Sequence, residues 1–190
     1  MRRIVLASTS PRRKELLKQC GVDDFEVIPS TFDEYLDEAR DVKDIVSELA
    51  LGKAREVAAA NPDAWVIGGD TLVSYMGSQI GKPVSEDDAL QTLKQLVGKT
   101  HQVHTAISLI CKDESVEQTE VATADVTFLN VSDDKLREYI ASGEPTDKAG
   151  SYAIQGEGAF LVDRIDGDPT TVVGLPVEMT TKLLQKYNIL

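Results

Sequence analysis

Apolar runs typical of buried strands alternate with helix patterns along the whole chain, and this alternation restricts the fold more than any other feature. The first run, residues 4–7, leads through a polar turn into a helix pattern with Ser10 as its N-cap and Pro11 at its first position. Further helices are predicted over about 43–60, 85–98, 132–143 and 176–187. Interleaved strands and helices of this kind predict an α/β fold.

Strand patterns fill the intervals between these helices. They lie at about 25–29, 64–67, 72–76, 79–80, 102–111, 116–129 and 159–165. Gly77-Ser78 is expected to form a two-residue hairpin turn between the two short runs that flank it. The chain contains no internal repeat, low-complexity tract or linker, so residues 1–190 are expected to form one domain.

The charge balance and the cysteines exclude several classes of protein. The chain has 32 Asp and Glu residues against 20 Lys and Arg, a formal net charge of −12. A field of that sign opposes binding to duplex nucleic acid, whose affinity depends on neutralising phosphates. Cys20 and Cys111 are too few and too far apart for a disulfide framework or a zinc site. The first residues do not resemble a signal peptide and no stretch reaches membrane-spanning length, so a cytoplasmic protein without a membrane partner is expected.

A basic turn before the first helix interrupts this acidic background. It reads Ser8-Thr9-Ser10-Pro11-Arg12-Arg13. A helix N-terminus offers unpaired N–H groups and the positive end of its dipole, which together favour an anion. Arg12 and Arg13 oppose that dipole unless an anion lies over the turn. Two interpretations are open: a phosphate site that includes Ser8, Arg12 and Arg13, or an ordinary capped helix with solvated arginines.

Carboxylates that follow two of the strand patterns are candidates for chemistry. Asp70 follows Gly68-Gly69 at the expected end of a buried strand, a frequent position for catalytic carboxylates in α/β folds. Asp33 and Glu34 come after an earlier strand pattern and offer a second carboxylate. Two carboxylates with phosphate oxygens form the hard-oxygen environment that Mg²⁺ or Mn²⁺ prefers. The other interpretation of Asp70 is a turn residue that satisfies nearby N–H groups.

Two lysines are candidate phosphate contacts. Lys53 lies in a helix pattern whose face is otherwise apolar and small, and Lys82 lies in the stiff turn Gly81-Lys82-Pro83. A lysine in either place supplies a point charge for a phosphate. An ordinary surface lysine is the alternative for each.

A glycine-rich segment and two histidines complete the candidates. Residues 143–158 combine many glycines with Lys, Asp, Tyr and Gln, which indicates a loop shaped around a ligand. In it, Gln155 offers both a donor and an acceptor, as recognition of a base edge requires. His101 and His104 stand three residues apart in a strand pattern and face opposite sides of it, so they are interpreted as structural.

Eight motifs occur in order along the chain. They are LASTSPRRKELL at 6–17, FDE at 32–34, GKA at 52–54, IGGDT at 67–71, GKP at 81–83, GKTHQVHT at 98–105, SGEPTDKAGSYAIQG at 142–156 and VVGLPV at 172–177. Together they resemble the Maf family of nucleoside triphosphate pyrophosphatases over nearly the whole chain. The resemblance implies a single two-lobed α/β domain around a long, bent, mixed β-sheet, as in Maf and inosine-triphosphatase proteins, with a central active-site cleft.

The same resemblance implies an activity and roles for particular residues. The family hydrolyses the α–β phosphoanhydride of a nucleoside triphosphate with a divalent metal cation, giving a monophosphate and pyrophosphate. Asp70 would be the general base or metal-side carboxylate, helped by Glu34, and these two residues would hold the Mg²⁺ or Mn²⁺. The triphosphate would be held by Ser8, Arg12, Arg13, Lys53 and Lys82.

The segment Tyr152-Ala153-Ile154-Gln155-Gly156 resembles the branch of the family that acts on dTTP and UTP. Arg12, Thr71 and Gln155 match positions that this branch associates with substrate choice, and modified pyrimidine nucleotides are further candidate substrates. Gly69 departs from the family pattern, because alanine is common there. A homodimer is expected from the resemblance alone.

Two other functions remain open. One is a nucleotide-binding regulator of cell division without physiologically important turnover. Asp70 argues against it, because a carboxylate beside the phosphates weakens anion binding and serves better as a base. The other is a purine-preferring member of the inosine-triphosphatase group, against which the loop motifs argue.

Overall fold

The computed structural model describes residues 1–32 and 39–190. In these residues a mixed seven-stranded sheet has the order β2-β1-β3-β5-β6-β7, with β4 also paired to β3. β1 is parallel to β2 and β3, and the other neighbours are antiparallel. The strands are β1 (Ile4–Leu6), β2 (Glu26–Val27), β3 (Trp65–Tyr75), β4 (Ser78–Ile80), β5 (Thr100–Cys111), β6 (Val116–Phe128) and β7 (Val162–Asp166).

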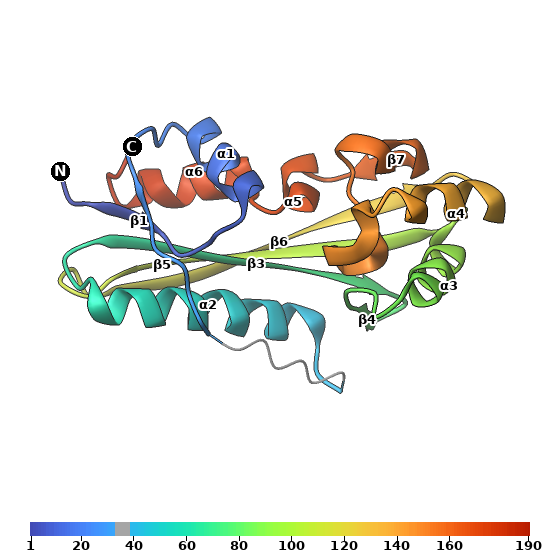
Figure 1. Ribbon diagram of the computed structural model, residues 1–190. Helices are drawn as coiled ribbons and strands as arrows, with labels where there is room; N and C mark the ends of the chain where they lie inside the picture. The colour runs from blue at the N-terminus through green and yellow to red at the C-terminus, as the bar shows by residue number, and fades with distance from the viewer. Residues whose placement is uncertain (33–38) are drawn as a thin grey trace.

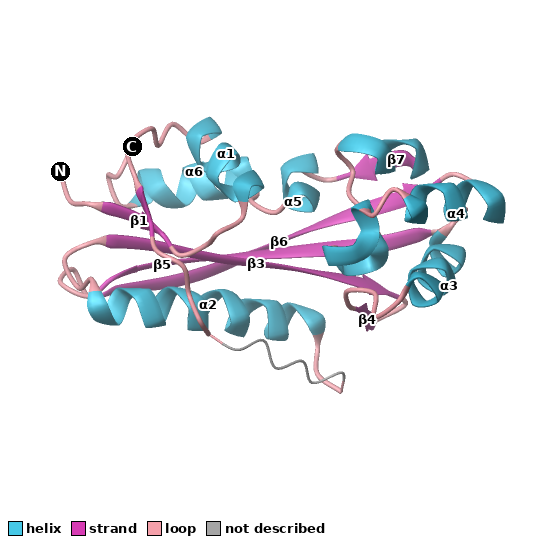
Figure 2. Cartoon of the chain, viewed as in Figure 1, coloured by secondary structure: helices cyan, strands magenta, loops and turns pink. Residues whose placement is uncertain are grey.

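Helices cover both faces of the long central strands. α2 lies along one face, α1, α5 and α6 lie on the other, and α3 and α4 gather with β4 and β7 at the far end (Figure 1). Their bounds are α1 (Pro11–Gln19), α2 (Val42–Ala60), α3 (Glu86–Leu96), α4 (Asp133–Ala141), α5 (Pro169–Val173) and α6 (Val177–Lys186). This arrangement of a mixed sheet with flanking helices confirms the predicted α/β class (Figure 2).

Separate apolar cores lie on the two faces and at the far end of the sheet. Alternation along β3 sends Val66 into the core beneath α2 and Ile67 into the core beneath α1 and α6. At the far end, Leu93, Leu136 and Phe128 form another core around α3 and α4. The long strands β3, β5 and β6 therefore connect two lobes, each of which buries its own apolar side chains.

The predicted helix starts are present in the structure. The Ser10 hydroxyl accepts a hydrogen bond from the Arg13 N–H at 3.3 Å, and Ser85 caps α3 through the Asp88 N–H at 3.0 Å. Ser132 caps α4 in the same way. No helix in the described part of the chain is both long and apolar enough to cross a membrane.

The centre of β3 differs from the prediction. We expected a strand that ends near residue 67 and a second that begins at 72, with Asp70 at a strand end. Instead β3 runs unbroken through Gly68-Gly69-Asp70, because these residues pair with β5, Gly68 opposite Ser108. A Cβ on Gly68 would lie 2.7 Å from the Ala50 carbonyl oxygen, so the glycine lets α2 pack directly on the strand.

Three other local expectations are corrected by the structure. The hairpin turn is Met76-Gly77 rather than Gly77-Ser78, since Tyr75 pairs with Ser78 and both turn residues have positive φ, 50° and 79°. The glycine-rich segment contains 3₁₀ turns, the last of which delays the start of β7 to Val162. α5 was not predicted, because five residues are too few to show a helical period. The 3₁₀ turns of the glycine-rich segment are η1 (Glu144–Asp147), η2 (Ala149–Ser151) and η3 (Gly156–Leu161).

Candidate active site

Two short strands pair with the same edge of β3 and leave an interval between them. β1 pairs with residues 65–67 and β4 with residues 73–75, whereas the opposite edge pairs with β5. After β1 the chain turns away into α1, at the carboxyl end of a parallel strand, which is a common ligand position in α/β sheets. A cavity of about 520 Å³ opens beside this interval.

Segments from both lobes line the cavity. They are the turn before α1, the centres of α2 and β3, the chain after β4, residues 147–155 and the end of α5. Every site residue predicted from the sequence lines it, as far as the described residues extend: Ser8, Arg12, Arg13, Lys53, Asp70, Thr71, Lys82 and Gln155. Glu34, the predicted second carboxylate, lies outside the described residues.

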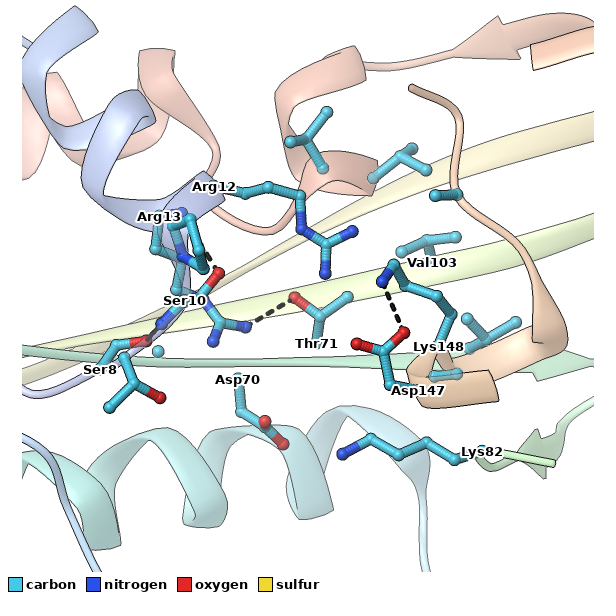
Figure 3. Close-up of a pocket in the computed structure, with 18 of the residues that line it drawn as sticks. Ser8, Ser10, Arg12, Arg13, Asp70, Thr71, Lys82, Val103, Asp147 and Lys148 are labelled. Carbon is cyan, nitrogen blue, oxygen red and sulfur yellow. Dashed lines mark hydrogen bonds and ion pairs between the residues drawn. The ribbon is translucent and has the colours of Figure 1, made fainter. Parts of the chain in front are cut away.

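The turn before α1 presents hydroxyl groups and arginines to the cavity. The Ser8 hydroxyl accepts a hydrogen bond from the Ser10 N–H at 3.2 Å, and Ser10 in turn caps the helix. Arg12 and Arg13 both extend from the first turn of the helix toward the cavity (Figure 3). The two guanidinium groups and the N-terminus of α1 therefore all face the cavity, an arrangement that favours the binding of an anion.

Arg13 is fixed from two sides. Its Nε donates to the carbonyl oxygen of Gly174 at 2.8 Å, and its Nη2 donates to the hydroxyl of Thr71 at 3.1 Å. The first bond ties α1 to the segment after α5, and the second ties it to β3. The guanidinium plane is therefore held in one orientation before any ligand arrives, which reduces the entropy lost on binding.

Asp70 and Lys53 form an ion pair on the other side of β3. Lys53 Nζ lies 3.0 Å from Asp70 Oδ1, and the two side chains are 15% and 10% exposed. Alternation along the strand directs Asp70 toward α2 and Thr71 toward α1. Lys82 extends toward Asp70 from the end of β4 (Figure 3).

The second oxygen of Asp70 is not used by the ion pair with Lys53. Asp70 Oδ2 is buried and has no hydrogen-bond partner among the described residues. No three His, Cys, Asp or Glu side chains within residues 1–32 and 39–190 form a cluster that holds a metal ion by itself. One carboxylate oxygen completed by phosphate oxygens and water is a coordination that Mg²⁺ accepts in phosphate sites, so Asp70 fits such an ion.

A second ion pair at the cavity was not predicted from the sequence. Lys148 Nζ lies 2.6 Å from Asp147 Oδ1, and the Lys148 side chain is 19% exposed. The hydrogen bond from Lys148 lowers the pKa of Asp147, with a smaller contribution from the charge of Arg12. The density of glycine and polar residues in 143–158 was the available signal, but nothing in the spacing separates Lys148 from a surface lysine.

Apolar side chains form another part of the cavity wall. Val73, Val103, Val172 and Tyr152 line it. Tyr152 is 5% exposed and is hydrogen-bonded through its hydroxyl to His101 Nε2 at 2.6 Å. A wall of this kind suits the faces of a flat ring, whereas the opposite side of the cavity suits phosphates.

The two histidines are buried on different sides of β5, as predicted. Burial lowers the pKa of His101 to about 4, so its ring is neutral at pH 7. His104 is hydrogen-bonded to the hydroxyls of Ser74 and Thr123 at 2.8 and 2.9 Å. Neither ring is among the described side chains that line the cavity, and both stabilise strand packing.

Comparison with known proteins agrees with these observations. The family model for Maf-like proteins matches residues 3–187. Relatives named dTTP/UTP pyrophosphatase from Bacillus cereus and from Bacillus thuringiensis subsp. konkukian are 47% and 46% identical over 189 residues, covering 100% of this chain and 97% of each relative. The solved structure of the Staphylococcus aureus Ham1 protein covers 98% of this chain and 100% of its own, with a TM-score of 0.57 and 15% identity, a likeness of fold alone. The chain therefore belongs to the family of Maf-like proteins.

Proposed function

We propose that this chain is a nucleoside triphosphate pyrophosphatase that hydrolyses the α–β phosphoanhydride of dTTP and UTP to the monophosphate and pyrophosphate. The observation that carries the proposal is the buried oxygen Asp70 Oδ2, which has no hydrogen-bond partner among the described residues and belongs to a residue that lines the same cavity as Arg12 and Arg13. Relatives at 46–47% identity that are named dTTP/UTP pyrophosphatase support the same activity and the same two substrates.

The cationic side chains are proposed to hold the triphosphate from two directions. Arg12 and Arg13 approach from the start of α1, and Lys53 and Lys82 approach from the side of α2 and β4. Ser8 adds a hydroxyl in the turn. Hydrolysis of a phosphoanhydride depends chiefly on positioning and on neutralising charge, so fixed cations lower the barrier without reorganising.

Asp70 is proposed as the general base. The ion pair with Lys53 holds Oδ1 and leaves Oδ2 to accept a proton from water. The water oxygen forms a bond to phosphorus while the bond between phosphorus and the bridging oxygen breaks. The electron pair of the broken bond leaves on the departing phosphate group, and the proton passes to Asp70.

A divalent cation, Mg²⁺ or Mn²⁺, is proposed as the cofactor. Asp70 would hold it, and Glu34 is the second ligand predicted from the sequence. When bound, such an ion neutralises charge on the phosphate oxygens.

Direct selection of the base is proposed for Gln155, while Arg12 and Thr71, the other positions that the resemblance associates with substrate choice, line the same cavity. Gln155 is exposed in the free protein and lines the cavity near Tyr152, so its amide is available to a base edge. The valines and Tyr152 would contact the ring faces. Thymine and uracil share the donor and acceptor pattern that one amide group can match, which accounts for a site that accepts both.

The remaining expectations are part of the same proposal. Residues 1–190 would act as one pyrophosphatase domain in the cytoplasm. A homodimer is proposed from the family resemblance alone. Duplex nucleic acid is not proposed as a partner because the net charge of −12 opposes polyanions, and a membrane is not proposed because no stretch reaches membrane-spanning length.

A nucleotide panel tests the function. Pyrophosphate and monophosphate are measured with dTTP, UTP, CTP, ITP and XTP, each with Mg²⁺, with Mn²⁺ and with EDTA. We expect dTTP and UTP to be the best substrates, with equal release of the two products and no turnover in EDTA. Faster turnover of ITP or XTP would support the purine-preferring alternative, and tight binding of dTTP without turnover would support a regulator.

A further inference from the structure

A chain of hydroxyl groups connects Arg13 to the interior of the protein. Arg13 Nη2 lies 3.1 Å from Thr71 Oγ1, which lies 2.8 Å from Thr105 Oγ1, which lies 2.7 Å from the carbonyl oxygen of Thr171. Thr71 and Thr105 are direct cross-strand partners in β3 and β5, so the sheet itself sets their separation. Thr105 is completely buried behind Thr71.

The direction of every proton in this chain follows from its two ends. A carbonyl oxygen only accepts, so the single hydroxyl proton of Thr105 is donated to Thr171. Thr105 must then accept from Thr71, although the distance alone leaves that donor undecided. The proton of Thr71 is thereby committed, and its oxygen accepts from the guanidinium of Arg13.

We infer that Thr105 is a positioning residue that fixes Thr71 as a hydrogen-bond acceptor for Arg13 and so orients the Arg13 guanidinium toward the triphosphate. The inference rests on the proposed function, in which Arg13 binds phosphate. Successive donations polarise each hydroxyl, which strengthens the charge-assisted bond at the arginine end. Gly174 supplies the second anchor of the same guanidinium, so both anchors depend on the segment 171–174.

A consequence concerns the part that Thr71 takes in substrate choice. Because its proton is committed to Thr105, Thr71 has no donor left for a nucleobase. Thr71 then acts on the ligand through Arg13 rather than by reading the base edge. Loss of its hydroxyl is expected to weaken binding of all triphosphates by a similar factor and to leave their ranking unchanged.

Binding of inorganic tripolyphosphate, measured by calorimetry without metal, tests the inference without requiring turnover. Thr105→Val replaces the hydroxyl by a methyl of similar size, and we expect it to weaken binding about tenfold, because Thr71 is no longer held as an acceptor for the charge-assisted bond from Arg13. Thr105→Ser keeps the hydroxyl and is expected to bind within about twofold of the wild type. Thr71→Val breaks the same chain at a less buried position and is expected to match Thr105→Val, which keeps the test informative if Thr105→Val does not fold.

Two controls separate positioning from packing. Thr119→Val removes a hydroxyl from the Ser108–Thr119 pair, which joins β5 to β6 at 2.7 Å, and is expected to bind tripolyphosphate like the wild type. In an Arg13→Ala background, Thr105→Val is expected to have no further effect, because the effect passes through Arg13.

Other results of these binding measurements would contradict the inference. Wild-type binding by Thr105→Val, equal losses in Thr105→Ser and Thr105→Val, or an additive loss in the Arg13→Ala background would each overturn the inference. A change in the ratio of dTTP to dCTP affinity in Thr71→Val would show that Thr71 reads the base. Failure of the wild type to release pyrophosphate while it binds tripolyphosphate would contradict the proposed function and leave this test intact.

Discussion

Lys53 Nζ on α2 lies 3.0 Å from Asp70 Oδ1 at the middle of β3, and both side chains are almost buried. The pair joins the helix and the strand that form one wall of the cavity. It exists because Gly68, two residues before Asp70, lets the backbone of α2 approach the strand. The carboxylate is thus held through one oxygen, while the other is buried without a hydrogen-bond partner among the described residues.

Asp70→Asn is expected to lower pyrophosphate release by a factor of about 10² to 10⁴, the range for loss of a general base. The amide keeps the shape and a contact to Lys53 but accepts no proton from water. Nucleotide binding, measured separately by calorimetry, is expected to persist, because the cations around the triphosphate remain.

Asp63→Asn is the control for loss of a carboxylate, since Asp63 is about half exposed and pairs with Arg3 outside the cavity. It is expected to retain full turnover. Turnover by Asp70→Asn at the wild-type rate would rule out the proposed base.

The adjacent glycines of β3 are expected to respond differently to alanine. A Cβ on Gly68 would lie 2.7 Å from the Ala50 carbonyl and 2.8 Å from the Ala54 N, both in the α2 backbone. Gly68→Ala is therefore expected to push α2 away from Asp70, with a loss of about 1–3 kcal/mol in the free energy of unfolding and a large loss of turnover.

Gly69→Ala is the matched variant. Its Cβ would meet the flexible end of Ile107 at 3.0 Å, Arg13 Nε at 3.3 Å and the Ala106 carbonyl oxygen at 3.4 Å, all longer than the contacts at Gly68. We expect a smaller loss of turnover than in Gly68→Ala, because side chains can yield where the α2 backbone cannot, and a change in stability below about 1 kcal/mol, read from urea unfolding. Equal damage from both substitutions would contradict the proposed dependence on the α2 contact.

The sequence allowed the α/β class and most helix starts to be predicted, because local signals determine them. Ser10, Ser85 and Ser132 each cap a helix as expected. The unbroken path of β3 through Gly68-Gly69 was not predictable in this way. It depends on pairing with β5, a contact between residues distant in sequence, which outweighs the local tendency of glycine to end a strand.

Part of the candidate site was predictable from residues whose charge is unfavourable at their place in the secondary structure. Arg12 and Arg13 at a helix N-terminus are one such case, and both line the cavity. Lys148 and Thr105 have no such local signal. Their positions depend on an ion pair and on cross-strand register, which only the folded chain shows.

The stability of the protein is expected to fall as the pH falls from about 6.5 toward 5, partly through His101. Its pKa is about 4 in the folded protein, below the value of about 6.5 in an unfolded chain, because burial opposes the charged ring. In this interval the unfolded chain binds a proton that the folded protein does not bind. The expected loss is up to about 1.4 kcal/mol per pH unit.

The double variant His101→Phe, Tyr152→Phe removes both polar groups of the 2.6 Å hydrogen bond and keeps the aromatic packing around Phe128. Urea unfolding at pH 7.5 and at pH 5 is expected to show a smaller pH dependence than in the wild type. The contribution of His104 is common to both proteins, so the difference between them reports His101. The same slope in both proteins would contradict this assignment.

Glu144 is expected to hold the segment that carries Lys148, Tyr152 and Gln155. Its Oε1 accepts from the Tyr139 hydroxyl at 2.8 Å and from the Gly158 N–H at 3.1 Å, and its Oε2 accepts from the Glu157 N–H at 3.0 Å. Both ends of the segment are therefore tied to one carboxylate. Burial and the bond to Glu144 raise the pKa of Tyr139, which keeps its hydroxyl protonated as a donor.

Glu144→Ala loses all three acceptor contacts, whereas Glu144→Gln turns one oxygen into a donor and loses about one of them. We expect thermal stability to fall in the order wild type, Glu144→Gln, Glu144→Ala, with roughly 1–3 kcal/mol for the alanine variant. Amide exchange at Glu157 and Gly158 and the KM for dTTP are expected to rise in the same order. Glu138→Ala, on the exposed face of α4, is the control, and unchanged exchange in Glu144→Ala would show that other contacts hold the segment.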